Sequence, residues 1–135
     1  MTNPKYRVMW IEDDAELLRL ARLILSHKGF EVIPVNDSRE AMDMIRREKP
    51  DVIMLDLMMP YVDGWDIYNQ IKSDTGLKHI PVVVVTAKAH AADKAMALHL
   101  AKVDGYLTKP YEQTQLLDVP NRVLSRGGDS RSKSA

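Results

Sequence analysis

Polar side chains that could do chemistry follow short apolar runs at four separate places in the sequence. Asp56 lies inside the stretch VIMLDLMMP, residues 52–60, which reads as deeply buried. A buried carboxylate is costly unless it is paired, hydrogen-bonded or bound to a metal, so Asp56 needs a partner from elsewhere in the chain. The other polar residues that end apolar runs are Glu12, Asp13, Asp14, Thr86 and Lys109.

The types of these residues indicate a site for a cation and an anion together. Carboxylates within reach of one another repel, and their pKa values rise unless a cation keeps them ionised. Oxygen ligands without His or Cys suit a hard cation, most simply magnesium, which also favours a phosphate oxygen. Lys109 can bind a phosphate as a point charge, and the Thr86 hydroxyl can donate to a phosphoryl oxygen. The missing ligand is therefore expected to be a phosphoryl group.

The elements that would position these residues alternate along the chain. Apolar or β-branched runs predict five strands, and segments with helical spacing of apolar residues follow each of them. Asp14 is a plausible N-cap of the first helix and Gly29 its C-cap. The predicted strands are 6–11, 30–35, 51–57, 80–87 and 105–108, and the predicted helices are 14–29, 38–49, 64–74, 90–102 and 112–124.

Alternation with short connections predicts an α/β domain in which a parallel sheet lies between helices. The carboxyl ends of parallel strands share one edge of the sheet, and ligands bind in the crevice at that edge. Because every polar residue singled out above lies at such an end, four distant stretches are expected to form one site.

The residues from Lys5 to Leu124 resemble the receiver domain of bacterial two-component response regulators. The resemblance rests on four motifs in this order, with spacing near that of the family. They are IEDD, PDVIMLDLMMPYVDG, IPVVVVTA and DGYLTKPY. It implies a doubly wound, flavodoxin-like sheet of five parallel strands in the order 2-1-3-4-5, with five helices.

The resemblance also implies a role for each matching residue. Asp56 would be the phosphorylated aspartate, and Lys109 would contact the phosphoryl group. Thr86 and Tyr106 would form a switch pair, and Met58 and Lys88 would flank the path of the water that removes the phosphoryl group. Magnesium would be bound by the set that consists of the acidic pair Glu12 and Asp13, the carboxylate of Asp56, and the backbone carbonyl of Met58.

As a receiver domain, the chain would be a phosphoacceptor switch and not a metabolic enzyme, since it would catalyse only its own phosphorylation and dephosphorylation. The expected donor is a sensor histidine kinase or a phosphotransfer protein. The expected output is a change at the surface of the fourth helix, fifth strand and fifth helix that controls a downstream protein. The sequence does not decide whether the chain forms a homodimer. It also does not decide between a stand-alone regulator and one domain of a larger protein.

The composition bears on whether the chain binds nucleic acid, spans a membrane or is secreted. The 135 residues carry 19 basic and 19 acidic side chains, so no basic excess favours direct binding to nucleic acid, and no apolar run approaches the roughly 20 residues of a membrane span. With no Cys and no signal peptide, the expected location is cytoplasmic. We expect a receiver domain over residues 1–125 and a flexible tail or linker over 126–135, where Gly, Ser and charged residues dominate.

Three other functions are weighed against this one. A phosphatase of the haloacid dehalogenase type needs a second Asp two residues after the nucleophile, where this chain has Met58. An FMN carrier needs a phosphate loop after the first strand, where the sequence EDDAE would repel phosphate. A receiver that only binds proteins would not need the full set of site residues. The phosphoacceptor remains the preferred function.

Two departures from the family pattern are expected to alter local structure. Lys109 follows Thr86 by 23 positions, one more than expected, and the family usually has Gly near Lys102, so the end of the fourth helix should differ. Pro120 lies inside the fifth predicted helix, which should be kinked or split there.

Overall fold

The structure is a computed structural model that describes residues 6–87, 90 and 94–134. Its elements alternate as the sequence predicts. The strands are β1 Arg7–Ile11, β2 Glu31–Val35, β3 Val52–Asp56, β4 Val82–Ala87 and β5 Gly105–Lys109. The helices are α1 Ala15–His27, α2 Ala41–Glu48, α3 Gly64–Ser73, α5 Lys94–Leu100 and α6 Gln113–Ser134, and a short 3-10 helix, η1, spans Ser38–Glu40.

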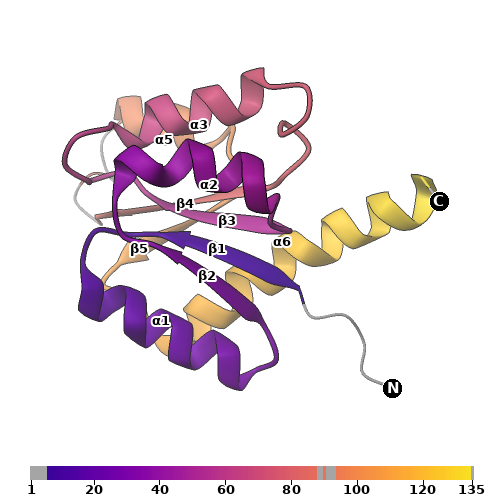
Figure 1. Ribbon diagram of the computed structural model, residues 1–135, viewed down its shortest axis with the longest axis horizontal. Coiled ribbons are helices and arrows are strands. Elements are labelled where there is room, and N and C mark those ends of the chain that lie inside the picture. Colours follow the sequence, from indigo (N-terminus) through magenta and orange to yellow (C-terminus); the bar gives the residue numbers. More distant parts are fainter. Residues whose placement is uncertain (1–5, 88–89, 91–93, 135) are drawn as a thin grey trace.

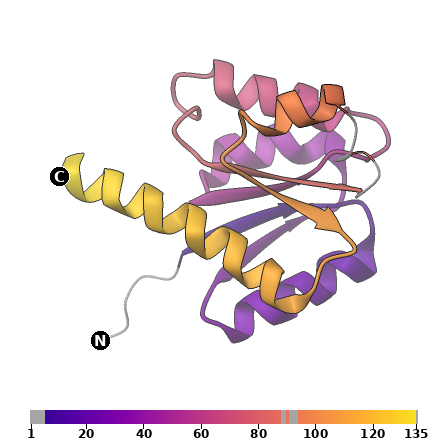
Figure 2. The same ribbon diagram turned by 180° about the vertical axis from the view of Figure 1, so that it is seen from behind.

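The five strands are parallel and have the order β2-β1-β3-β4-β5, so the predicted doubly wound, flavodoxin-like topology is confirmed. Helices α1 and α6 cover one face of the sheet, while α2, α3 and α5 cover the other (Figures 1 and 2). The three central strands are buried on both faces, which explains why they consist of nearly unbroken apolar residues.

Each face of the sheet has its own apolar core. Toward α1 and α6, side chains such as Trp10 and Val85 pack against Leu25 and Leu116. Toward α2 and α3, the next residues along the strands pack against the inner faces of those helices. A smaller cluster joins Leu57, Val84 and Leu100 beneath α5. The alternation of side chains along a strand therefore divides one continuous apolar run between two cores.

The sequence predicts a helix that is kinked or split at Pro120. Helix α6 runs without a break through this residue, so the split is wrong, whereas the kink stays a prediction. A proline removes one hydrogen bond and crowds the preceding turn, but apolar residues on both sides hold the helix on the sheet. These buried residues are Leu116, Val119, Val123 and Leu124. Burial of four apolar side chains at about 1.5–3 kcal/mol each exceeds the penalty of about 3 kcal/mol for an internal proline.

The last turns of α6, residues 126–134, are helix rather than irregular chain and extend away from the sheet (Figure 1). The domain boundary at residue 125 and the independence of the tail stay predictions. At the end of α5, the amides of Lys102 and Val103 donate to carbonyls three residues earlier, and Lys102 is not among the residues with positive φ. This helix end therefore lacks the left-handed turn that a glycine would provide, as expected.

Gly64 allows the first turn of α3 to approach the end of β3 closely. A Cβ atom at this position would lie 2.7 Å from the Cα of Leu57 and 2.9 Å from the carbonyl oxygen of Asp56. Both neighbours are backbone atoms, which cannot move without displacing the strand end that carries Asp56. The requirement for glycine here is therefore steric, and it lies beside the candidate site.

We predict that Gly64→Ala destabilises the domain by roughly 1–3 kcal/mol, because the new methyl group overpacks a rigid contact. Gly76→Ala is the matched control, since its Cβ would meet only the Asp74 carboxylate, at 3.3 Å, and should change the stability by less than about 1 kcal/mol. Urea unfolding of both variants measures the difference. Equal stabilities would contradict the steric role of Gly64.

Candidate functional site

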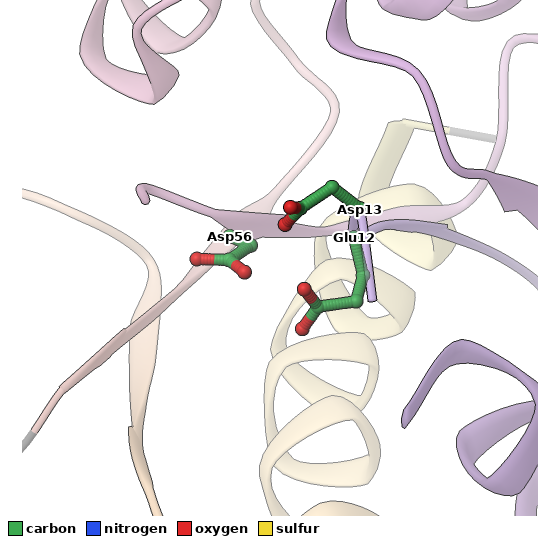
Figure 3. Close-up of side chains that lie close together, drawn as sticks. All are labelled: Glu12, Asp13 and Asp56. Atoms are coloured by element: carbon green, nitrogen blue, oxygen red, sulfur yellow. The ribbon is translucent and has the colours of Figure 1, made fainter. Parts of the chain in front are cut away.

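Three carboxylates meet at the carboxyl edge of the sheet. Glu12 and Asp13 follow β1, Asp56 is the last residue of β3, and Figure 3 shows the first two pointing toward Asp56. One oxygen atom from each residue lies within 4.8 Å of the others. Glu12 and Asp56 are buried, whereas Asp13 is exposed. The cluster is thus anchored in the protein on one side and open to solvent on the other.

Lys109 brings the one ammonium group that contacts this cluster among the described residues. Its Nζ donates to Oε1 of Glu12 at 2.6 Å and to Oδ2 of Asp56 at 2.9 Å. Residues from the ends of β1, β3 and β5 are therefore joined by a single cation. Because this cation faces three carboxylates, the cluster keeps an excess of negative charge when all three are ionised.

The pKa of Glu12 is raised, mainly by burial. Burial, together with the hydrogen bond that it shares with Asp56, raises the pKa of Glu12 to about 8, although Lys109 acts in the opposite direction. Burial by itself would lower the pKa of Lys109, but its hydrogen bonds to Glu12 and Asp56 raise it. Lys109 therefore stays charged at neutral pH, and the cluster can take up either a proton or a further cation.

The carboxylate of Asp56 is fixed at both oxygens. Its Oδ1 accepts a hydrogen bond from the backbone amide of Met58 at 2.9 Å, and its Oδ2 accepts the bond from Lys109. The side chain of Met58 is exposed, so this residue reaches the site through its backbone. Residue Lys88, expected to flank the water path with Met58, lies outside the residues that the structure describes.

Asp14 takes no part in the cluster and caps α1, as the sequence predicts. Its Oδ1 accepts hydrogen bonds from the amides of Glu16 at 3.0 Å and Leu17 at 3.3 Å. Its own amide donates to Oε2 of Glu12 at 3.2 Å. Of three consecutive acids, the first two lie in the cluster and the third stabilises the helix start. The cap at Asp14 was predicted from the sequence pattern, whereas the place of Glu12 and Asp13 beside a metal was implied by the family resemblance.

Thr86 lies on β4 next to the cluster. Val85 pairs with Asp56 in the sheet, and Ala87 pairs with Lys109, so Thr86 is placed between β3, which carries Asp56, and β5, which carries Lys109. The residue is 1% exposed, and its hydroxyl has no hydrogen-bond partner within the described part of the chain. A buried hydroxyl without a partner is uncommon and costs free energy. Thr86 can therefore donate to a group that enters the site.

Tyr106 lies on β5 opposite Val84, two positions before Thr108, and does not join the cluster. Its side chain is half exposed, and it lines a hollow of about 530 Å³ between the end of α5, β5 and α6. The two residues of the expected switch pair are therefore on neighbouring strands, with the hydroxyl of Thr86 buried and the ring of Tyr106 turned outward.

Tyr111 is a neighbour of the cluster that the sequence analysis does not single out. Burial raises the pKa of its phenol, and the charge of Glu12 adds to this effect. Its ring lies 6.2 Å from that of Trp10, between centroids. Its position in the sequence could have predicted this location, because Tyr111 follows Lys109 by only two residues and side chains so close along the chain stay near the site.

Comparisons with known proteins agree with this arrangement. The family model of the response regulator receiver domain matches residues 8–120. The DNA-binding response regulator MtrA of Mycobacterium tuberculosis is 30% identical over 129 residues, which cover 96% of this chain and 55% of MtrA. The sensory transduction protein RegX3 of the same species is 35% identical over 126 residues, which cover 93% of this chain and 54% of RegX3.

Solved structures show the same fold. A signal receiver domain from Vibrio parahaemolyticus has a TM-score of 0.87 and 24% identity, with 98% of this chain and 99% of that one covered. The chemotaxis response regulator CheY4 of Vibrio cholerae has a TM-score of 0.79 and 24% identity, with coverages of 89% and 99%.

The chain spans about half the length of the curated relatives it matches. None of the helices within the described residues has the length and apolar character needed to cross a membrane. The match of the family model extends from β1 to the middle of α6 and includes the acid cluster, Thr86 and Lys109. This chain belongs to the response regulator receiver domain family.

Proposed function

We propose that this receiver domain is a phosphoacceptor switch in which Asp56 takes a phosphoryl group from a histidine kinase or a phosphotransfer protein in the cytoplasm. The observation that carries the proposal is the buried carboxylate of Asp56, held by Lys109 and by the Met58 amide beside two further acids. A carboxylate that only stabilised the fold would need the cation of Lys109 but not two further carboxylates beside it.

The residues present fit magnesium. The donor set consists of carboxylate oxygens without His or Cys, one of the three acids is open to solvent, and the cluster carries more negative charge than Lys109 compensates. The carboxylates of Asp13 and Asp56 and the backbone carbonyl of Met58 would hold the ion, with Glu12 beside them. When bound, magnesium supplies positive charge to the phosphoryl oxygens and to the acids.

Asp56 then acts as the nucleophile. One of its oxygens forms a bond to phosphorus while the bond between phosphorus and the donor histidine nitrogen breaks, which gives an acyl phosphate and a free imidazole. Lys109 neutralises charge on the transferred group and keeps Asp56 oriented. Attack of water at phosphorus later restores the carboxylate and releases inorganic phosphate.

The signal leaves the site through Thr86 in this proposal. A phosphoryl group on Asp56 offers the acceptor that the buried Thr86 hydroxyl lacks, and movement of Thr86 toward it vacates space for the ring of Tyr106 to turn inward. The surface of α5, β5 and α6 would change and alter the affinity for a downstream protein, without direct binding of this domain to nucleic acid. A ligand shifts such an equilibrium only by its different affinities for the two states.

The proposed acceptor is tested by phosphorylation with a small acyl phosphate, followed by intact mass. We predict an adduct of one phosphoryl group only when a divalent cation is present, and none in Asp56→Asn, because an amide is not a nucleophile for this transfer. Asp43→Asn is a matched control, since Asp43 is an exposed residue of α2 that is not part of the cluster. An adduct at the wild-type level in Asp56→Asn would sink the assignment.

Asp13 and Asp14 should differ sharply in their effect on the metal. Asp13→Ala removes one of the three clustered carboxylates and should weaken magnesium binding by at least about tenfold, since the loss of even an outer-shell partner of a metal ligand costs about 10–100-fold in affinity. Asp14→Ala should cost helix stability, about 1 kcal/mol, and leave the metal affinity within about threefold. A fluorescence titration with magnesium measures both. Equal losses of affinity would refute this division of roles.

The switch is tested at Thr86. Thr86→Ala should still accept a phosphoryl group but should lose most of the response at Tyr106 and α5, because a hydrogen bond to a charged group is worth roughly 1.5–3 kcal/mol and changes the ratio of states about ten- to a hundredfold. Thr86→Ser keeps the hydroxyl and should retain the response. The measurement is the change in amide spectra on addition of beryllofluoride and magnesium. A full response in Thr86→Ala would exclude this route.

A further inference from the structure

Two loops that both leave the carboxyl edge of the sheet are joined by Ser38. The Ser38 hydroxyl donates to the carbonyl oxygen of Pro60 at 2.6 Å and accepts from the amide of Val62 at 3.1 Å. Ser38 begins η1, after β2, whereas Pro60 and Val62 belong to the loop 57–63 that follows Asp56. The residue is 4% exposed, so its hydroxyl is shielded from water and bonds the loop as both donor and acceptor.

The backbone at the bridged point has an unfavourable conformation. The amide of Val62 also donates to the carbonyl of Pro60, at 3.0 Å, which closes a three-residue turn around Tyr61, and Tyr61 has a φ of 75°. A turn of this kind is rare and strained, and a residue other than glycine keeps a positive φ only where its surroundings hold it. Ser38 bonds both ends of this turn and is placed to hold it.

Arg39 contacts the same turn from outside. Its guanidinium carbon lies 3.9 Å from the centre of the Tyr61 ring. The guanidinium is itself fixed by Asp37, with Nε–Oδ1 and Nη2–Oδ2 distances of 3.0 and 2.8 Å, and these bonds lower the pKa of Asp37. An exposed aromatic ring in a strained turn therefore has a cation oriented against its face.

The turn continues directly from the residues that orient the acceptor. Pro60 is two residues after Met58, whose amide donates to Oδ1 of Asp56. At its other end the loop enters α3 at Gly64, which packs against Leu57 and the carbonyl of Asp56. Because Gly64 is held against the end of β3, a change of φ at Tyr61 would redirect the chain on the other side of the turn and displace the backbone of Met58.

We propose that Ser38 is a positioning residue for phosphoryl transfer, which holds the strained turn at Tyr61 and thereby keeps the backbone of Met58 aligned with Asp56. Arg39 supports the same turn through the Tyr61 ring. The inference rests on the proposed function, since it specifies how that site is held. Ser38 itself contacts none of the reacting atoms and acts through the loop 57–63.

The decisive variant is Ser38→Ala, compared with Ser73→Ala, the same change at an exposed position on the last turn of α3. The rate of phosphorylation by a small acyl phosphate is measured over a range of magnesium concentrations, and amide spectra are recorded without metal or donor. Ser38→Ala should lower the rate about tenfold at low magnesium, raise the magnesium concentration for half the maximal rate, and shift the amide signals of Met58 and Val62. Ser73→Ala should behave as wild type.

A second pair of variants separates positioning from general stability. Glycine adopts a φ of 75° without strain, so in a Tyr61→Gly background the same Ser38→Ala change should lower the rate less than about threefold. Additive losses in the double variant, or a loss of thermal stability without any change in magnesium dependence or in the Met58 amide, would overturn the proposal.

If Ser38→Ala does not fold, Arg39→Ala tests the same turn. The Arg39 side chain is largely exposed, so its removal should leave the domain folded. It should shift the same amide signals and lower the rate about threefold, consistent with loss of one cation–π contact at a surface site. Unchanged amide signals in Arg39→Ala would exclude a role of Arg39 in holding the turn at Tyr61. If the wild-type chain accepts no phosphoryl group, the proposed function fails, whereas the amide spectra of the metal-free variants still decide whether Ser38 positions Met58.

Discussion

The ion pair of Lys109 with two buried carboxylates is the interaction on which the rest of the structure depends. One ammonium group joins Glu12 after β1, Asp56 at the end of β3 and the end of β5. Two carboxylates that are almost fully buried would repel each other without this cation, and removal of one partner from a buried pair is strongly destabilising. Only a parallel arrangement of these strands brings the three residues to one edge, so the sheet order and the site require each other.

Much of this arrangement could be predicted from the sequence, for physical reasons. Parallel strands that are buried on both faces must be apolar on both, so continuous apolar runs such as residues 52–55 and 82–85 can be recognised as central strands. Parallel strands also place their carboxyl ends together, which predicts that Glu12, Asp56 and Lys109 meet although 97 positions separate the first from the last. The strand order itself did not follow from the pattern and came from the resemblance to receiver domains.

Other features depend on tertiary contacts that no local pattern contains. Pro120 argued for a split helix, but the burial of Leu116 and Val123 on either side outweighs the local penalty. Tyr106 is one of the switch pair that the resemblance implies, but the half-exposed state of its ring could not be predicted, because a strand position fixes the face of the sheet and not the rotamer of the side chain. Ser38 bonds Pro60 and Val62, which follow it by 22 and 24 positions. No pattern in either loop predicts that the two loops are in contact.

The site lacks two things: positive charge to balance its acids, and a hydrogen-bond acceptor for the Thr86 hydroxyl. The acids around Lys109 carry more negative charge than this one cation offsets when all three are ionised, and burial, together with the hydrogen bond to Asp56, raises the pKa of Glu12. Thr86, on the neighbouring strand, carries a buried hydroxyl without a partner in the described chain. A phosphoryl group that enters with a divalent cation would bring positive charge for the acids and an acceptor for Thr86. In the proposed function, the phosphorylated state would satisfy the acids and the Thr86 hydroxyl together, and an interaction made in one state alone is what a switch requires.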